Sequence, residues 1–286
     1  MSYTTVLLNS TNVVKGSTNN RLVYTFPQAK QFKDNSIVLD GLALFYSWFN
    51  ISAKYGNNQF SYNWFNSTGT GYTTYDIIIP DGFYDARAIN AFIQSVFITN
   101  KHYVTSSITN KQTFLLEIIE NSTFYSIQMN SYAINQAYLT SQNWVIPSGA
   151  TWTVGATILQ PQFVINSNAF RDIAGFASGS YPPINSPTTG VIYSSLSSVC
   201  PQVSPVNSLI VRCNLVSSIY GIPTDVLTSC HINGNWGEII SFNPSNANPI
   251  KIRDGIYDRI EITICDQNFN DIAIIDPSMV IRLLIG

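Results

Sequence analysis

Apolar and polar side chains alternate along much of this chain, which is the pattern of β-strands that bury one face. The alternation is clearest in residues 113–121, 125–130, 208–216, 258–265 and 279–285. The side chains predicted to face a core are Phe114, Leu116, Ile118, Tyr125, Ile127, Met129, Leu209, Val211, Cys213, Leu215, Ile260, Ile262 and Ile264. Turn-forming residues 121–123 separate the first two segments, so we expect a hairpin there. Strands with one polar face indicate antiparallel sheets packed on a core.

Helical spacing of apolar residues is scarce. The best candidate covers about residues 85–98, where Asp85 can cap the first turn and Ala86, Ile89 and Ile93 recur on one face. A second, shorter candidate covers residues 168–176 and would end at Gly175. Helices are therefore expected only in connections between strands.

This pattern predicts an all-β fold, a single jelly-roll β-sandwich with elaborated loops and one short helix at about residues 85–98. We expect one domain over residues 1–286, with an N-terminal arm and a loop insertion around residues 130–200. The Pro- and Ser-rich residues 180–190 are expected to form a surface loop within it. No repeat or change of composition marks a boundary between domains.

Charge is scarce in this chain. Only 10% of its 286 residues are charged, against about 25% in typical soluble domains, and the net charge is -2. So weakly charged a surface favours a protein that works in an assembly. The 14 Lys and Arg residues form no basic stripe, so nucleic acid is not expected as a partner. No apolar run reaches the length that spans a bilayer, so membrane insertion is not expected, and the first residues lack the pattern of a signal peptide.

Residues 266–277, DQNFNDIAIIDP, carry the densest group of acidic and amide side chains. Asp266, Asn268 and Asn270 alternate as in a calcium loop, but Asp271 stands where such a loop needs glycine and Pro277 where it needs glutamate. Asp and Asn also favour tight turns, because their side chains accept hydrogen bonds from neighbouring backbone N–H groups. We therefore interpret the segment as a connection between strands, with a bound cation as the alternative.

Catalytic chemistry has few candidate residues. The two histidines are His102 and His231, and His231 follows Cys230 directly, although adjacent residues of an extended chain point to opposite faces. A hydrolase that uses either histidine with Cys230 or a carboxylate remains a rival hypothesis. The four cysteines show no paired spacing of zinc ligands, so we expect free thiols. We predict no enzyme and no catalytic, cofactor-binding or metal-binding residues.

Aromatic residues are abundant, with 16 Tyr, 16 Phe and 5 Trp. The cluster in residues 45–65 could present flat rings for stacking on sugars, or it could fill a core and contact other subunits. We favour the core because nothing in the sequence marks the rings as exposed.

Five blocks, residues 77–94, 170–183, 208–218, 223–229 and 251–285, together resemble the penton, or minor capsid, protein of virophages and Polinton-type viruses. The last block is the most specific, with a strand, Asp-Gln-Asn, a strand, Asp-Pro and a terminal strand. The resemblance makes Asp266, Gln267, Asn268, Asp276 and Pro277 a structural family signature. It implies a single jelly roll that forms a homopentamer at icosahedral fivefold vertices beside a double-jelly-roll major capsid protein, without catalytic residues.

We accordingly predict a structural capsid protein at the vertex of a virion, assembled in the host cell cytoplasm. The N-terminal arm, in which Pro27 should break a strand, is the candidate for reaching the major capsid protein. The alternative is a carbohydrate- or receptor-binding module on the same fold, with a host receptor or glycan as its partner.

Overall fold

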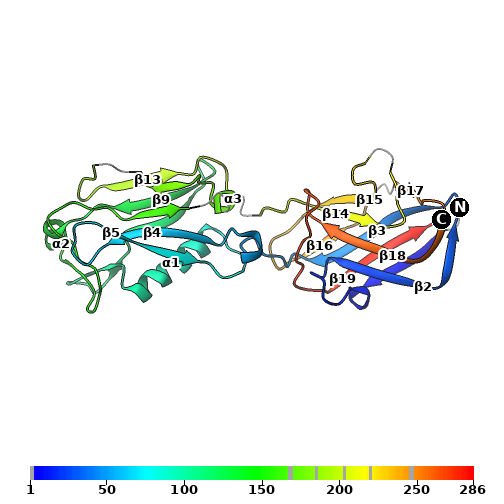
Figure 1. The fold of residues 1–286 in the computed structure, drawn as a ribbon, viewed down its shortest axis with the longest axis horizontal. Coiled ribbons are helices and arrows are strands. Elements are labelled where there is room, and N and C mark those ends of the chain that lie inside the picture. Colours follow the sequence, from blue (N-terminus) through cyan, green and yellow to red (C-terminus); the bar gives the residue numbers. More distant parts are fainter. Residues whose placement is uncertain (1–2, 167–169, 184–185, 202–203, 219–220, 245–247) are drawn as a thin grey trace. The chain divides into compact units, whose positions relative to one another are not determined.

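The computed structural model describes residues 3–166, 170–183, 186–201, 204–218, 221–244 and 248–286. The chain forms two compact units (Figure 1). Unit 1 comprises Met1–Phe49 and Val206–Gly286, and unit 2 comprises Asn50–Pro205. The expectation of one domain over residues 1–286 with an insertion around 130–200 is corrected, because a body with its own core is inserted at residue 50.

Unit 1 is built from strands. They are β1 (Thr4–Asn9), β2 (Arg21–Phe32), β3 (Ser36–Phe45), β14 (Ser208–Cys213), β15 (Val226–His231), β16 (Ile239–Phe242), β17 (Ile250–Lys251), β18 (Gly255–Cys265) and β19 (Met279–Ile285). The first sheet has the order β1-β19-β3-β16, with β17 also paired to β3, and the second has the order β15-β14-β18-β2. All of these pairs are antiparallel.

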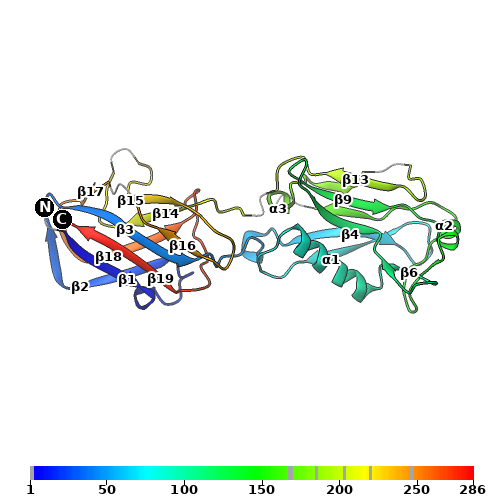
Figure 2. The same ribbon diagram turned by 180° about the vertical axis from the view of Figure 1, so that it is seen from behind.

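This strand order is that of a jelly roll. Leaving out the two-residue β17, eight strands form two sheets of four, and most connections cross from one sheet to the other. Unit 2 is inserted between the third and the fourth of these strands, β3 and β14. The predicted jelly-roll fold is therefore confirmed for unit 1, which can be followed from both sides in Figures 1 and 2.

The alternating side chains fill the interior of the sandwich as predicted. Leu209, Val211 and Cys213 of β14 are buried, as are Ile260, Ile262 and Ile264 of β18 and the alternate residues of β19 from Met279 to Ile285. Because side chains alternate across a strand, each of these strands can bury one face while its polar side chains stay at the surface.

The N-terminal residues are part of the sandwich, which corrects the predicted arm. Strand β1 pairs with β19 from Thr4 to Asn9, and β2 pairs with β18 over most of its length. Pro27 does not end the strand, because β2 continues to Phe32, but residues 26–29 have no partners in β18 where the register shifts between Tyr257 and Arg259. Proline lacks the N–H that pairing needs, so it is found at such irregularities of an edge strand.

Unit 2 combines three small sheets with helices. Its strands are β4 (Gln59–Phe65), β5 (Tyr72–Ile78), β6 (Val104–Ser106), β7 (Gln112–Thr113), β8 (Leu116–Asn121), β9 (Ser126–Tyr132), β10 (Trp144–Val145), β11 (Gln162–Ile165), β12 (Gly179–Tyr181) and β13 (Ile192–Leu196). The sheets have the orders β12-β11-β4-β5, β13-β9-β8 and β10-β6-β7. The helices are α1 (Ala86–Asn100), α2 (Gln136–Ser141) and α3 (Arg171–Ala174). Short 3-10 turns cover Ser10–Asn12 in unit 1 and Ala53–Tyr55 here.

The predicted helix at residues 85–98 is present as α1. The Asp85 carboxylate accepts a hydrogen bond from the Ala88 N–H at 2.7 Å, and the helix ends at Lys101 in the left-handed conformation. The shorter candidate is also present as α3, ended by Gly175, while its first residues 168–169 lie outside the described part. Helix α2 was not predicted from the sequence.

The expected hairpin is formed by β8 and β9, with one correction. Leu116, Ile118, Ile127 and Met129 are buried as predicted, but Tyr125 is exposed and has a positive φ of 49°. It belongs to the turn, because β9 begins one residue later.

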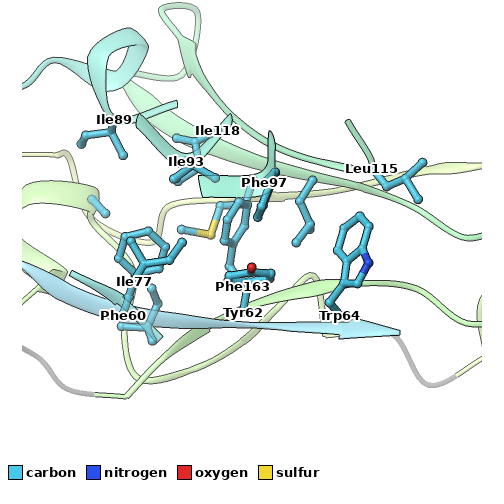
Figure 3. Packing of buried hydrophobic residues seen from close by; sticks show 14 of the residues in the cluster. Phe60, Tyr62, Trp64, Ile77, Ile89, Ile93, Phe97, Leu115, Ile118 and Phe163 are labelled. Carbon is cyan, nitrogen blue, oxygen red and sulfur yellow. The ribbon is translucent and has the colours of Figure 1, made fainter. Parts of the chain in front are cut away.

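The core of unit 2 is unusually aromatic. Phe60, Tyr62 and Trp64 of β4 point toward Ile89, Ile93 and Phe97 of α1 (Figure 3). Most of the aromatic rings in residues 45–65 are therefore buried, including Tyr46 and Trp48 in unit 1.

Candidate functional site

The segment from Asp266 forms a self-contained turn. Its carboxylate Oδ1 accepts hydrogen bonds from the N–H groups of Asn268 and Asn270, both at 2.8 Å, and Oδ2 accepts one from Asn270 Nδ2 at 3.1 Å. Phe269 adopts the left-handed conformation, with φ of 64°, where the chain reverses. The carboxylate oxygens are thus occupied by the turn itself, as the turn interpretation predicted.

The rest of the signature fastens the connection between β18 and β19 to its surroundings. Asp276 Oδ1 accepts a hydrogen bond from the Ser278 N–H at 2.8 Å, which holds the pKa of Asp276 below its ordinary value. The Asp276 N–H donates to Ser47 Oγ at 3.0 Å, just before Pro277 and β19. Gln267 Oε1 accepts a hydrogen bond from the Asn207 N–H at 3.2 Å.

Residues 271–276 do not form the strand expected between the two motifs. Ile272 and Ile274 are buried, and the Ile274 N–H donates to the Thr18 carbonyl at 2.9 Å. Asp271 Oδ1 accepts a hydrogen bond from Asn20 Nδ2 at 3.0 Å. In the part of the chain that the structure describes, no group of three or more His, Cys, Asp or Glu side chains could hold a metal ion.

The candidate catalytic residues do not form a site. His102 belongs to the core of unit 2 and is 1% exposed. Its Nδ1 atom forms a hydrogen bond with the Tyr62 hydroxyl. Cys230 belongs to unit 1, where its thiol donates to the Leu209 carbonyl at 3.7 Å and burial raises its pKa to about 12. A buried neutral thiol is a poor nucleophile. His231 is exposed at the end of β15.

The carboxylates that could serve acid–base chemistry each contact different partners. Glu117 accepts a hydrogen bond from Asn130 Nδ2 at 2.9 Å, and Glu261 forms ion pairs with Arg21 and Arg259, each at 2.6 Å. Glu238 accepts hydrogen bonds from Asn235. Glycoside hydrolysis needs two carboxylates facing one another across a cleft, and these three do not supply such a pair.

The aromatic platform for sugars is also overturned. Trp48, Phe60, Tyr62, Trp64 and Phe65 are all at most 1% exposed, so none of these rings can stack on a sugar. All four cysteines are free thiols, as expected, and Cys200 is the exposed one.

Unit 1 has two flanks, and each flank is formed by one edge strand from either sheet. Strands β1 and β2 are edge strands on one flank, and β15 and β16 are edge strands on the other. Within the described residues, no further named strand pairs with the outer edge of any of the four, although Val13 forms an isolated bridge with Leu22 at the start of β2. Free strand edges and the opening between two sheets are surfaces that readily associate with other chains.

The β1–β2 flank contains a groove of about 770 Å³. It is lined mainly by Thr4 to Val6, by residues 26–32, and by Ile285. Phe26 and Phe32 lie with ring centroids 6.0 Å apart, so the lining is partly aromatic. The irregularity at Pro27 shapes this wall, since the residues that leave the β18 ladder line the groove.

The two flanks carry charges of opposite sign. Residues 1–33 contain Lys15, Arg21, Lys30 and Lys33 and no acidic residue, whereas residues 214–249 contain Asp225 and Glu238 and no Lys or Arg. Arg21 and Asp225 form ion pairs within the unit. The three lysines and Glu238 have no ion-pair partner among the described residues.

No protein-family model matches the chain, and no curated protein matches it in sequence. Two solved structures resemble it over its whole length. The mavirus penton protein has a TM-score of 0.47 and 12% identity, and the match covers 100% of this chain and 98% of that chain. A chain of the Sputnik virophage structure has a TM-score of 0.42 and 11% identity, with coverage of 99% and 96%.

None of the described helices has both the length and the hydropathy that crossing a membrane requires.

Proposed function

We propose that this chain is a structural protein of a viral capsid, and that copies of unit 1 associate flank to flank in a homopentameric ring at a fivefold vertex. The observation that carries the proposal is the jelly-roll strand order with two open flanks. In a closed ring each copy uses one surface to meet a different surface of the next copy. Two opposite flanks of one sandwich suit that requirement.

Charge supports the same arrangement. A basic flank that meets an acidic flank gains from attraction at every seam, whereas two copies of the same flank would repel one another. The low total charge also limits repulsion among five identical subunits.

The block resemblance in the sequence supports the viral role. Its most specific part, from Asp266 to Pro277, serves as a structural turn and not as a reactive centre. The proposal assigns the chain no reaction and no cofactor. It assigns a place in the virion after assembly in the host cytoplasm, with the double-jelly-roll major capsid protein as the neighbour of the ring.

The purified protein tests the proposal. Light scattering coupled to size exclusion should give five times the monomer mass of 31.8 kDa, and negative-stain microscopy should show fivefold rings. Virions should contain the protein at their vertices, as immunogold labelling would reveal. A protein that stays monomeric at every concentration and is absent from virions would contradict the proposal.

A further inference from the structure

An isoleucine stands almost fully exposed on the connection between β14 and β15. Ile222 is 96% exposed, although moving an isoleucine side chain out of water lowers the free energy. The base of this connection is fastened, because the Ser218 N–H donates to the Thr224 carbonyl at 2.6 Å and the Cys213 N–H to the Asp225 carbonyl at 2.9 Å. Ile222 itself takes no part in these hydrogen bonds, so it is available to a partner.

The groove on the β1–β2 flank lies at the same end of the sandwich. Asn35 lines the groove, and its carbonyl accepts a hydrogen bond from the Ile252 N–H at 2.9 Å. Ile252 in turn forms a bridge with Val216, at the start of the connection that carries Ile222. In Figure 1 β15 lies in the upper part of unit 1, whereas β2 runs along its lower side.

The groove offers apolar contacts beside polar ones. Val6, Phe32 and Ile285 in its lining are largely buried, and Phe26 is half-buried beside Phe32. Its volume of about 770 Å³ is ample for the turn of residues 221–223. Among the described residues that line it, Lys30 carries the only charged side chain.

We propose that Ile222 of one copy inserts into the groove between β1 and β2 of the next copy. The partner is a second copy of this chain, because the knob and the groove lie on opposite flanks of one sandwich at the same end, and the basic residues 1–33 would meet residues 214–249, which contain no Lys or Arg. An apolar knob and a pocket at different places on one molecule create a head-to-tail contact, which can close a ring. The inference deepens the proposed function by naming the contact at each seam.

Disulfide trapping tests the contact even if it is weak. The background is Cys200→Ser, since Cys200 is exposed. In it, the double variant Ile222→Cys with Ala29→Cys places one thiol on the knob and one in the groove lining. Mild oxidation should give a ladder of covalent dimers to pentamers on a non-reducing gel. The matched control pairs Ile108→Cys, also 73% exposed, with Ala29→Cys and should give no ladder. Equal products from both pairs would overturn the inference.

A mixing experiment tests the head-to-tail geometry. Ile222→Arg removes the knob and opposes Lys30, and Ala29→Trp fills the groove, so each variant alone should associate about tenfold or more weakly. An equimolar mixture retains one intact knob and one intact groove and should form a 1:1 dimer that grows no further. Ile108→Arg is the control and should assemble like the unchanged protein, and melting curves establish that all variants fold.

The outcomes separate the two proposals. Fivefold rings that persist in Ile222→Arg and Ala29→Trp would refute the knob-and-groove contact and leave the capsid role standing. A ladder from the cysteine pair in a protein that never enters virions would support the contact and refute the capsid role.

Discussion

The Nδ1 atom of His102 lies 2.7 Å from the hydroxyl oxygen of Tyr62 inside the core of unit 2. The imidazole also stacks on Trp64, with ring centroids 5.0 Å apart. Burial lowers the pKa of His102 from 6.5 to about 4, because a charged imidazole would lose its hydration there. The folded unit therefore holds a neutral histidine at neutral pH.

Unit 2 should lose stability in mild acid. The unfolded chain binds a proton at His102 below about pH 6.5, while the folded chain resists it until about pH 4. Stability is therefore complete above pH 6.5 and falls between pH 6.5 and 4, by about 3 kcal/mol in total. Urea unfolding across this range, followed by tryptophan fluorescence, measures the loss. His102→Phe should flatten the dependence, and equal slopes for both proteins would contradict the assignment.

Removing a ring from the same core should be costly. Phe60 is 1% exposed and stacks on Phe170, with ring centroids 4.7 Å apart. Phe60→Ala should lower the free energy of unfolding of unit 2 by about 3–5 kcal/mol, through lost burial and the cavity left behind. Phe124, which is 64% exposed, is the matched control, and Phe124→Ala should change stability by less than about 0.5 kcal/mol. Similar losses of stability in both variants would contradict the burial of Phe60 in the core of unit 2.

The turn at Asp266 should matter for stability and not for metal binding. Asp266→Ala removes the acceptor of two backbone N–H bonds and one side-chain bond, and should cost unit 1 about 1–3 kcal/mol. Asp266→Asn keeps an acceptor oxygen and should lose less. Millimolar calcium or EDTA should leave the melting temperature of the unchanged protein where it is. A calcium-dependent rise would favour the cation site instead.

Gly175 should be sensitive to the addition of a single methyl group. It has φ of 74°, and a Cβ there would lie 2.2 Å from the Val199 carbonyl oxygen. Gly56 has φ of 65° with nothing near the same position. Gly56→Ala should cost about 1 kcal/mol for the left-handed backbone alone, and Gly175→Ala clearly more because Val199 must also move. Denaturant unfolding of the two variants makes the comparison, and equal losses would contradict the close approach.

Much of the local structure could be predicted from the sequence. Alternation identified the buried faces of β14, β18 and β19, because a strand sends successive side chains to opposite sides. Asp85 marked the start of α1, because its carboxylate can satisfy a free N–H of the first turn. The Asp and Asn residues after Asp266 indicated a turn for the same local reason.

The larger organisation could not be predicted in this way. Strands of both units show the same alternation, so the pattern in residues 113–130 gave no sign that β8 and β9 pack in a separate body. The irregularity at Pro27 could be predicted, but it only interrupts the pairing of β2 with β18 and does not free an arm. Residues 271–276 have the composition of a strand. The Ile274 N–H nevertheless donates its hydrogen bond to the carbonyl of Thr18, which lies far away in the sequence.

The sequence by itself determined which residues form strands, which of their faces are buried and where α1 and the Asp266 turn lie, because each depends on neighbours within a few positions. Only the tertiary structure decided that unit 2 is inserted between β3 and β14, that the aromatic rings of β4 are buried, and that Ile222 and the groove share one end of the sandwich. Those outcomes depend on contacts between segments far apart in the chain, which local patterns do not encode.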